Sequence, residues 1–208
     1  MRGRLRGFLT GYFRNNLGLL LFVSLFFLLG IVAGTLAVQL LSGDQANSLV
    51  QYLDSFLNGL HNQPIDNQLL AERSILNNLQ VVLAIWFLGL TVIGIPLIVI
   101  IVFLRAFVFG FTVGFLVEKK AWQGIAFACF SILPQSLLFI PALILAGVAA
   151  VSFSLFLIGG RSPTRTGRLS GRFVSYCLFM LFLSAVAAAA GLVEAYITPV
   201  FIKLLATW

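Results

Sequence analysis

Residues 79–117 read LQVVLAIWFLGLTVIGIPLIVIIVFLRAFVFGFTVGFLV and carry a single charged side chain, Arg105. A straight α-helix of that length would measure about 58 Å, nearly twice the ~30 Å hydrocarbon core of a bilayer. The run must therefore break, bend or turn back. We predict the break at Gly94-Ile95-Pro96, because proline removes a helical hydrogen-bond donor and clashes with the preceding turn.

Further apolar runs flank this one and nearly fill the chain: Leu17 to Leu41, Ala121 to Ile158 and Phe173 to Tyr196. Each reaches the roughly 20 residues that a membrane-spanning helix needs. With 61% hydrophobic and 9% charged residues, residues 1–208 are predicted to form a single membrane domain of an all-α, polytopic integral membrane protein. The first run exceeds a signal-peptide core of about 7–15 residues, which favours a retained anchor.

Basic residues predict the orientation, because short loops rich in Lys and Arg stay in the cytoplasm. Arginines precede the first span and recur in the loop 159–172, whereas the segment 42–78 holds four acidic residues against one arginine. The two basic segments therefore belong inside, and segment 42–78 belongs outside. An even number of crossings must then precede the basic loop.

The run Ala121 to Ile158 is also too long for one straight span. Pro134 and Pro141 bracket a stretch that contains Gln135 and Ser136. These prolines predict a broken or re-entrant segment that is buried in protein or faces a wet cavity.

If one long run is a hairpin and the other is a single broken crossing, the number of crossings before the basic loop is even. We therefore expect five crossings in all, with the carboxyl end outside. Which run turns back stays open. Splitting the second run keeps Glu118-Lys119-Lys120 inside, as positive charge prefers, whereas splitting the first run places it outside.

Two segments are predicted to lie beside the membrane. Residues 1–16 place apolar side chains at helical spacing among arginines, as in an amphipathic interfacial helix on an anionic inner leaflet. In the outer segment, one helical face is apolar until Pro64 interrupts the helix. This candidate partner-contact face consists of Leu49, Leu53, Phe56, Leu57 and Leu60. This face could contact a partner, the protein's own spans or lipid, and the three alternatives are equal.

The chain offers little for catalysis. His61 is the only histidine and lacks the neighbouring ligands of a zinc site, and Cys129 and Cys177 lie in separate apolar runs. No serine stands in a nucleophile motif, and no phosphate-binding loop is present. We therefore expect no enzymatic activity, no cofactor, no metal and no nucleic-acid partner.

Arg105 and Glu194 are ionisable residues inside apolar runs, where charges are costly. Three interpretations stay open for them. They could reach the headgroups near a kink or an interface, form a structural salt bridge across helices, or belong to a proton or ion pathway.

Two glycine pairs, Gly30 with Gly34 and Gly110 with Gly114, have the spacing that lets membrane helices approach closely. Such a contact more often joins helices of one chain than two copies of it. Assembly into a homo-oligomer stays open.

Several stretches, taken in order and spacing, resemble the stage II sporulation protein M family over the whole chain. They are FVSLFFLLGIVAG (22–34), WFLGLTVIGIP (86–96), FGFTVGF (109–115), WQG (122–124), LPQ (133–135) and EAY (194–196). The family pattern also has a basic residue at the place of Arg105 and a glutamate at that of Glu194. Ser136 stands where that pattern usually has asparagine.

The resemblance implies a non-enzymatic membrane scaffold of the engulfment machinery in endospore-forming bacteria. Such a scaffold would recruit two cell-wall peptidoglycan hydrolases, stage II sporulation proteins D and P, to the septal membrane of the mother cell. The rival expectation is an oligomeric channel or a transporter (permease) subunit, because broken helices and buried charges also build solute paths.

Overall fold

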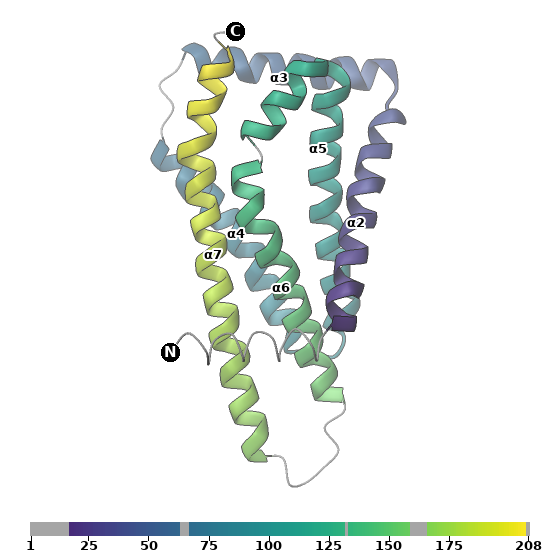
Figure 1. The fold of residues 1–208 in the computed structure, drawn as a ribbon, viewed down its shortest axis with the longest axis vertical. Helices are drawn as coiled ribbons and strands as arrows, with labels where there is room; N and C mark the ends of the chain where they lie inside the picture. The colour runs from purple at the N-terminus through teal and green to yellow at the C-terminus, as the bar shows by residue number, and fades with distance from the viewer. Residues whose placement is uncertain (1–16, 63–66, 132, 159–165, 207–208) are drawn as a thin grey trace.

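A computed structural model describes residues 17–62, 67–131, 133–158 and 166–206 (Figure 1). The described elements are α-helices, which confirms the all-α prediction. In chain order they are α2 (Leu17–Gln39), α3 (Gly43–Asn62), α4 (Asn67–Gly89), α5 (Gly94–Ser131), α6 (Leu133–Ile158) and α7 (Thr166–Ala206). The interfacial helix predicted at 1–16, Pro64 and the first part of the basic loop (159–165) lie outside the described residues.

Five of these helices, α2, α4, α5, α6 and α7, stand side by side in a bundle, and α3 lies across one end of it (Figure 1). Four stretches are long and apolar enough to cross a membrane: Leu17–Gln39, Gly94–Glu118, Leu133–Ile158 and Ser170–Tyr196. The multi-pass membrane prediction is thereby confirmed. Because α4 packs among these helices, chiefly against α7 and α6, the bundle is compatible with the five predicted crossings.

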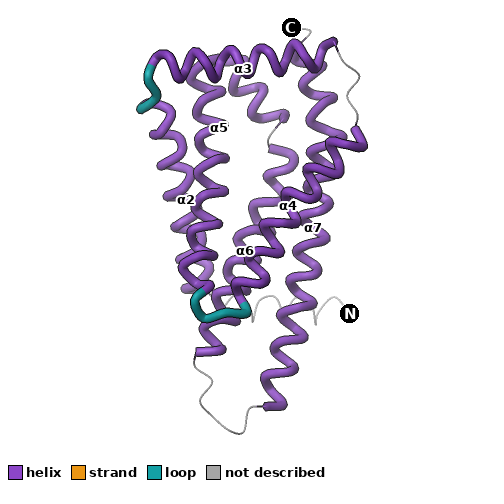
Figure 2. The backbone as a smooth tube through the Cα atoms, turned by 180° about the vertical axis from the view of Figure 1, so that it is seen from behind, coloured by secondary structure: helices purple, strands orange, loops and turns teal. Residues whose placement is uncertain are grey.

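The first long run is the hairpin. Helices α4 and α5 run antiparallel and are joined by the turn 90–93, which Figure 2 shows in teal. A Cβ atom on Gly94 would collide with the carbonyl oxygen of Leu88, so the turn closes around a glycine. Pro96 is the third residue of α5, where a backbone N–H would have no helical acceptor, and it costs the helix nothing there. The break therefore lies immediately before the predicted Gly94-Ile95-Pro96.

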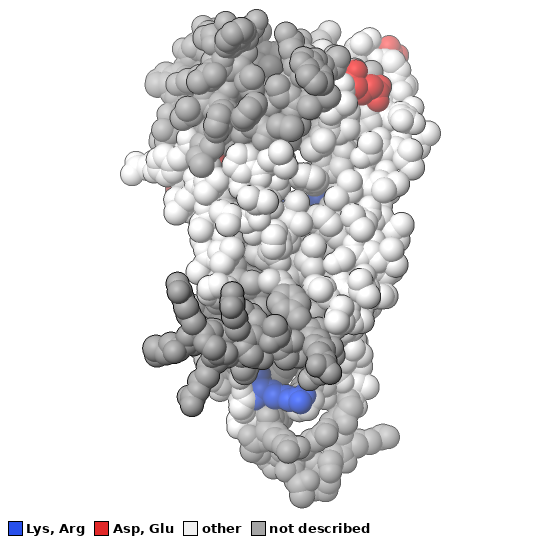
Figure 3. All heavy atoms as spheres, in the orientation of Figure 1, with Lys and Arg blue, Asp and Glu red and all other residues white. Residues whose placement is uncertain are grey.

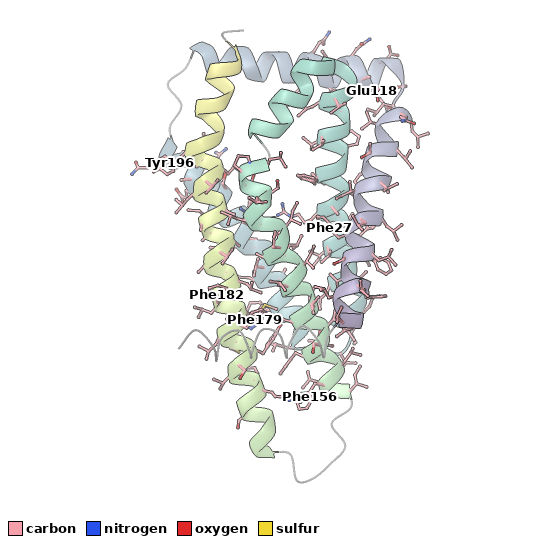
Figure 4. The ribbon with its side chains drawn as sticks, viewed as in Figure 1. Phe27, Glu118, Phe156, Phe179, Phe182 and Tyr196 are labelled. Atoms are coloured by element: carbon pink, nitrogen blue, oxygen red, sulfur yellow. The ribbon has the colours of Figure 1, made fainter. Side chains whose placement is uncertain are left out.

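The second long run is a single broken crossing. Helix α5 rises to α3, bends over at that end of the bundle and descends to Ser131, and α6 continues the descent from Leu133 (Figure 1). Glu118 accordingly lies at the end of the bundle that carries α3 (Figure 4). This is the arrangement that the charge of Glu118-Lys119-Lys120 disfavoured, so that local charge preference did not decide which run turns back.

The stretch between Pro134 and Pro141 is helical, which corrects the prediction of a non-helical segment there. Pro134 is the second residue of α6, where proline is well tolerated. Pro141 lies inside the helix and leaves the carbonyl of Leu137 without its helical donor. The helix boundary lies just before this stretch, between Ser131 and Leu133.

Helices α2 and α5 run parallel and share the most extensive helix contact among the described residues. A Cβ atom on Gly30 would lie 2.6 Å from the carbonyl oxygen of Phe103 and 2.7 Å from the Cβ of Ala106. Cβ atoms on Gly34 and Gly110 would collide with the carbonyl oxygens of Phe107 and Ile31. The structure thus places both predicted glycine pairs in one backbone-to-backbone contact within the chain.

Helix α6 is the centre of the bundle, and its small side chains let the other helices close on it. Ala146 and Ala150 are fully buried. The residues of neighbouring helices that are also 0% exposed are Val82, Ile85, Ile98, Val102, Ala106, Met180, Ala187 and Ala190. In a bilayer, van der Waals packing of this kind holds helices together, because lipid is as apolar as the side chains.

Side chains of α6 and α7 bind the backbone around the α4–α5 turn. The Tyr176 hydroxyl donates a hydrogen bond to the carbonyl of Trp86 (2.9 Å), and the Ser154 hydroxyl donates one to the carbonyl of Thr91 (2.7 Å). Carbonyls at the end of a helix lack intrahelical donors, so the Tyr176 hydroxyl supplies a donor to the Trp86 carbonyl. The Thr91 carbonyl also accepts from the N–H of Gly94 (3.3 Å), so Ser154 gives it a second donor. The Tyr176 ring also stacks on Phe153 with centroids 4.5 Å apart.

Changing Tyr176 to phenylalanine should lower the free energy of unfolding by about 1–3 kcal/mol, because the half-buried Trp86 loses the donor to its carbonyl. Ser154→Ala should lower it by only about 0.5–1.5 kcal/mol, because the Thr91 carbonyl keeps the N–H of Gly94 as a donor. Ser175→Ala is the matched control, since the exposed Ser175 hydroxyl bonds only its own helix, at the carbonyl of Gly171. Denaturant unfolding of the purified protein in detergent micelles would measure the three values. Equal stability of all three variants would contradict the role of these bonds in holding the turn.

The two ends of the bundle differ in charge. Figure 3 shows acidic atoms at the end that carries α3 and basic atoms near the opposite end, with a largely uncharged band between them. Arg172, near the start of α7, is exposed and lies with its guanidinium carbon 4.2 Å from the centre of the Phe156 ring. Helix α3, predicted to lie outside, and Arg172, from the basic loop predicted to lie inside, are therefore at opposite ends of the bundle.

Candidate functional site

Polar side chains from four helices meet where these helices pack together, and all but one of them are half-buried. We call Ser74, Asn77, Arg105, Gln135 and Glu194 the polar cluster, with α4 contributing the first two and α5, α6 and α7 one each. Arg105 is about 16 Å along the helix axis from Gly94 and about 20 Å from Glu118. The cluster is therefore anchored near the middle of the α5 span.

Glu194 is held by neutral hydrogen-bond donors. The side-chain amide of Gln135 donates to its carboxylate at 2.6 Å, and the side chain of Ser74 also hydrogen-bonds it. The backbones of α4 and α7 are close here because α7 has a glycine. A Cβ atom on Gly191 would lie 2.8 Å from the backbone nitrogen of Ile75. This close approach brings Ser74 within reach of Glu194.

Arg105 binds the backbone and the side chain of one residue. Its Nη2 donates to the carbonyl oxygen of Asn77 (3.2 Å) and to the side-chain oxygen of Asn77 (3.1 Å). Its guanidinium carbon lies 5.8 Å from the centre of the Phe139 ring, on α6. Arg105 and Glu194 attract each other electrostatically. Their hydrogen bonds go to different neighbours, so each charge is held by its own neutral partners.

Next to the polar cluster, Asn78 is 1% exposed and donates from its side-chain amide to the carbonyl of Ala187 at 3.4 Å. This bond joins α4 to α7 one helical turn below Ser74. The arrangement ties four helices together through hydrogen bonds and one pair of opposite charges.

Within the described ranges, no three His, Cys, Asp or Glu side chains gather where they could hold a metal ion.

The structure brings together three residues that the sequence singled out, Arg105, Glu194 and Gln135. Sequence reasoning missed Ser74, Asn77 and Asn78, because it began the apolar run at Leu79 and left these residues in the outer loop. The adjacent amides of Asn77 and Asn78, directly before a long apolar run, are the signal that could have found them.

The second candidate surface is α3. Its first turn is capped reciprocally: the backbone N–H of Ser42 donates to the side-chain oxygen of Gln45 (3.1 Å), and the Gln45 N–H donates to the Ser42 hydroxyl oxygen (3.4 Å). Ala46 is buried and Leu49 is half-buried, so the first part of the apolar face of α3 points away from solvent. The side chains of Leu53, Phe56, Leu57 and Leu60 lie outside the described part of the structure.

The opposite face of α3 is exposed and mostly polar, with Asn47, Ser48, Gln51 and Ser55. Tyr52 is 75% exposed on the same helix. A large aromatic side chain in this position is the most prominent apolar group that the described part of α3 offers to the surroundings.

A family model described as stage II sporulation protein M matches residues 23–199. The matched region contains the polar cluster, α3 and both glycine pairs. No curated protein and no solved structure gives a significant match.

Proposed function

Because this chain belongs to the stage II sporulation protein M family, we propose that it is a non-enzymatic membrane scaffold of the engulfment machinery in endospore formation. The family is one of sporulation membrane proteins and is not known as an enzyme family. The partners we propose are the cell-wall hydrolases, stage II sporulation proteins D and P, which the scaffold recruits to the septal membrane of the mother cell.

The observation that carries this proposal is the position of α3. A helix that lies across one end of a membrane bundle, rather than through it, presents a surface parallel to the membrane plane (Figure 1). With the basic segment of α7 at the opposite, cytoplasmic end, α3 faces the cell wall, where peptidoglycan hydrolases act.

Tyr52 is the residue of α3 that we expect to contribute most to partner binding. Tyrosine is enriched among the side chains that dominate binding energy at protein interfaces, because its ring buries a large area and its hydroxyl can hydrogen-bond. Exposed at the border between the polar and apolar faces of α3, it offers an anchor that a hydrolase ectodomain could enclose.

The test is affinity purification of the tagged protein, in mild detergent, from cells entering sporulation. The wild-type protein should retain both hydrolases, and Tyr52→Ser should lower their recovery roughly 30-fold if Tyr52 is worth about 2 kcal/mol. Tyr196→Ser is the matched control, since Tyr196 is 53% exposed and lies on the outward side of α7 (Figure 4).

Absence of both hydrolases from the wild-type preparation would contradict the scaffold proposal. Full recovery with Tyr52→Ser would place the contact elsewhere. The rival function, a channel or transporter subunit, rests on the polar cluster in the middle of the membrane. Recovery of an ATPase instead of the hydrolases would favour that rival.

A further inference from the structure

The outward face of α4 exposes polar side chains inside the membrane region. Residues at helical spacing form one exposed line, which we call the α4 stripe. It consists of Glu72, Arg73, Leu76, Gln80, Leu83 and Phe87. Its apolar members are 36–68% exposed. The opposite side of the same helix is used internally, since Ser74 and Asn78 contact α7.

The polar members of the α4 stripe lie at membrane depth. Gln80 is about 13 Å along the axis from the inner end of α4, and Glu72 and Arg73 are about 25 Å from it. The neighbouring span Gly94–Glu118 has 25 residues, or about 37 Å, and starts at the same turn. Gln80 therefore lies within the hydrocarbon, and the two charges lie in its outer part.

Nothing in the described part of the chain satisfies these three side chains. Glu72, Arg73 and Gln80 make no hydrogen bond or ion pair there. Lipid tails offer no donors or acceptors, so exposed charges and amides at this depth are costly unless another protein surface or water covers them. The polar half of α4 is also why this helix, alone among the five of the bundle, does not qualify as a candidate span.

We propose that a second copy of this chain covers the α4 stripe, giving a homodimer with a two-fold axis along the membrane normal. Two α4 helices then run side by side in the same direction. A two-fold interface brings the same residues of both copies together, so the stripe must be complementary to itself.

The α4 stripe meets this requirement. Glu72 and Arg73 are adjacent and opposite in charge. Glu72 of each copy can therefore face Arg73 of the other copy, which gives two ion pairs across the axis. The Gln80 amide is both donor and acceptor and can pair with the same residue of the second copy. Leu76, Leu83 and Phe87 pack around these contacts. This dimer does not depend on the hydrolase partners.

Disulfide cross-linking in native membranes tests the dimer. In a Cys129→Ala, Cys177→Ala background, Leu76→Cys should give a disulfide-linked dimer on oxidation. Leu29→Cys is the matched control on the surface of α2, because Leu76 is 49% exposed and Leu29 is 48% exposed. Dimer from Leu76→Cys alone supports the proposal. No dimer, equal dimer from both variants, or a cross-link of Leu76→Cys to a different protein would overturn it.

Charge exchange gives an independent test that a folding defect cannot imitate. Glu72→Arg places two positive charges on each stripe and Arg73→Glu places two negative ones, so each variant alone should lose most of its self-association. Differently tagged copies of the two variants, expressed together, should copurify at least tenfold better than either variant with itself. Mixed pairing no stronger than self-pairing would overturn the two-fold α4 interface.

Discussion

Arg105→Leu is expected to lower the free energy of unfolding by about 1.5–3 kcal/mol, and Glu194→Leu by a similar amount, because each charge makes hydrogen bonds to neutral partners and attracts the other charge. Each change leaves the opposite charge in the polar cluster without its counterpart, in a region where water cannot easily compensate. Arg105→Leu also leaves the side-chain oxygen of Asn77 without its donor, and Glu194→Leu leaves the side-chain amide of Gln135 without its acceptor.

The double variant Arg105→Leu, Glu194→Leu should lose clearly less stability than the sum of the two single changes, because it removes both charges together. Denaturant unfolding in micelles measures all three. Arg172→Leu is the control for loss of an exposed arginine, whose contact with the Phe156 ring is expected to contribute about 0.5–1 kcal/mol. Additive losses in the double variant would show that Arg105 and Glu194 do not stabilise each other.

Gly34→Val and Gly110→Val should prevent accumulation of folded protein or lower its stability by about 3 kcal/mol or more. The added Cβ atoms would collide with carbonyl oxygens of the facing helix, and backbone cannot move aside as a side chain can. Gly114→Ala should be milder, since its Cβ would meet the methyl group of Thr35 at 3.2 Å.

Gly18→Val is the matched control for these glycines, because it lies on α2 with nothing within 4 Å of the added Cβ. Fluorescence-detected gel filtration of membrane extracts would compare folded yields. If Gly34→Val accumulates as well as Gly18→Val, the close α2–α5 contact described above is incorrect.

The features that were predictable from sequence depend on local rules. The break near Pro96 follows from the length of one apolar run and the chemistry of proline, and the close helix contacts follow from the spacing of Gly30, Gly34, Gly110 and Gly114. These rules depend only on nearby residues. The features they predict are therefore the same whichever helices pack together in the bundle.

The features that were not predictable depend on packing partners. Whether residues 79–117 or 121–158 turn back is decided by how α4 fits against α6 and α7, and the charge of Glu118-Lys119-Lys120 is too small a preference to override that packing. Pro134 and Pro141 are compatible with a helix, since one occupies the first turn and the other removes a single hydrogen bond.

The polar cluster was partly predictable. Arg105 and Glu194 were conspicuous as charges in apolar runs, and Gln135 as an amide between prolines. Their α4 partners were hidden because α4 starts at Asn67, well before its apolar part. A hydropathy pattern therefore assigned the polar half of a bundle helix to the outer loop.

We expect α3 to lie outside the cell, where it can hold wall hydrolases, and the start of α7 to lie in the cytoplasm. Gly43→Cys and Gly171→Cys in the cysteine-free background test this orientation, because neither glycine has an atom within 4 Å of the added Cβ. A membrane-impermeant maleimide should label Gly43→Cys in intact cells and should label Gly171→Cys only after permeabilisation. Labelling of both positions from outside, or of Gly171→Cys alone, would contradict the orientation and with it the scaffold proposal.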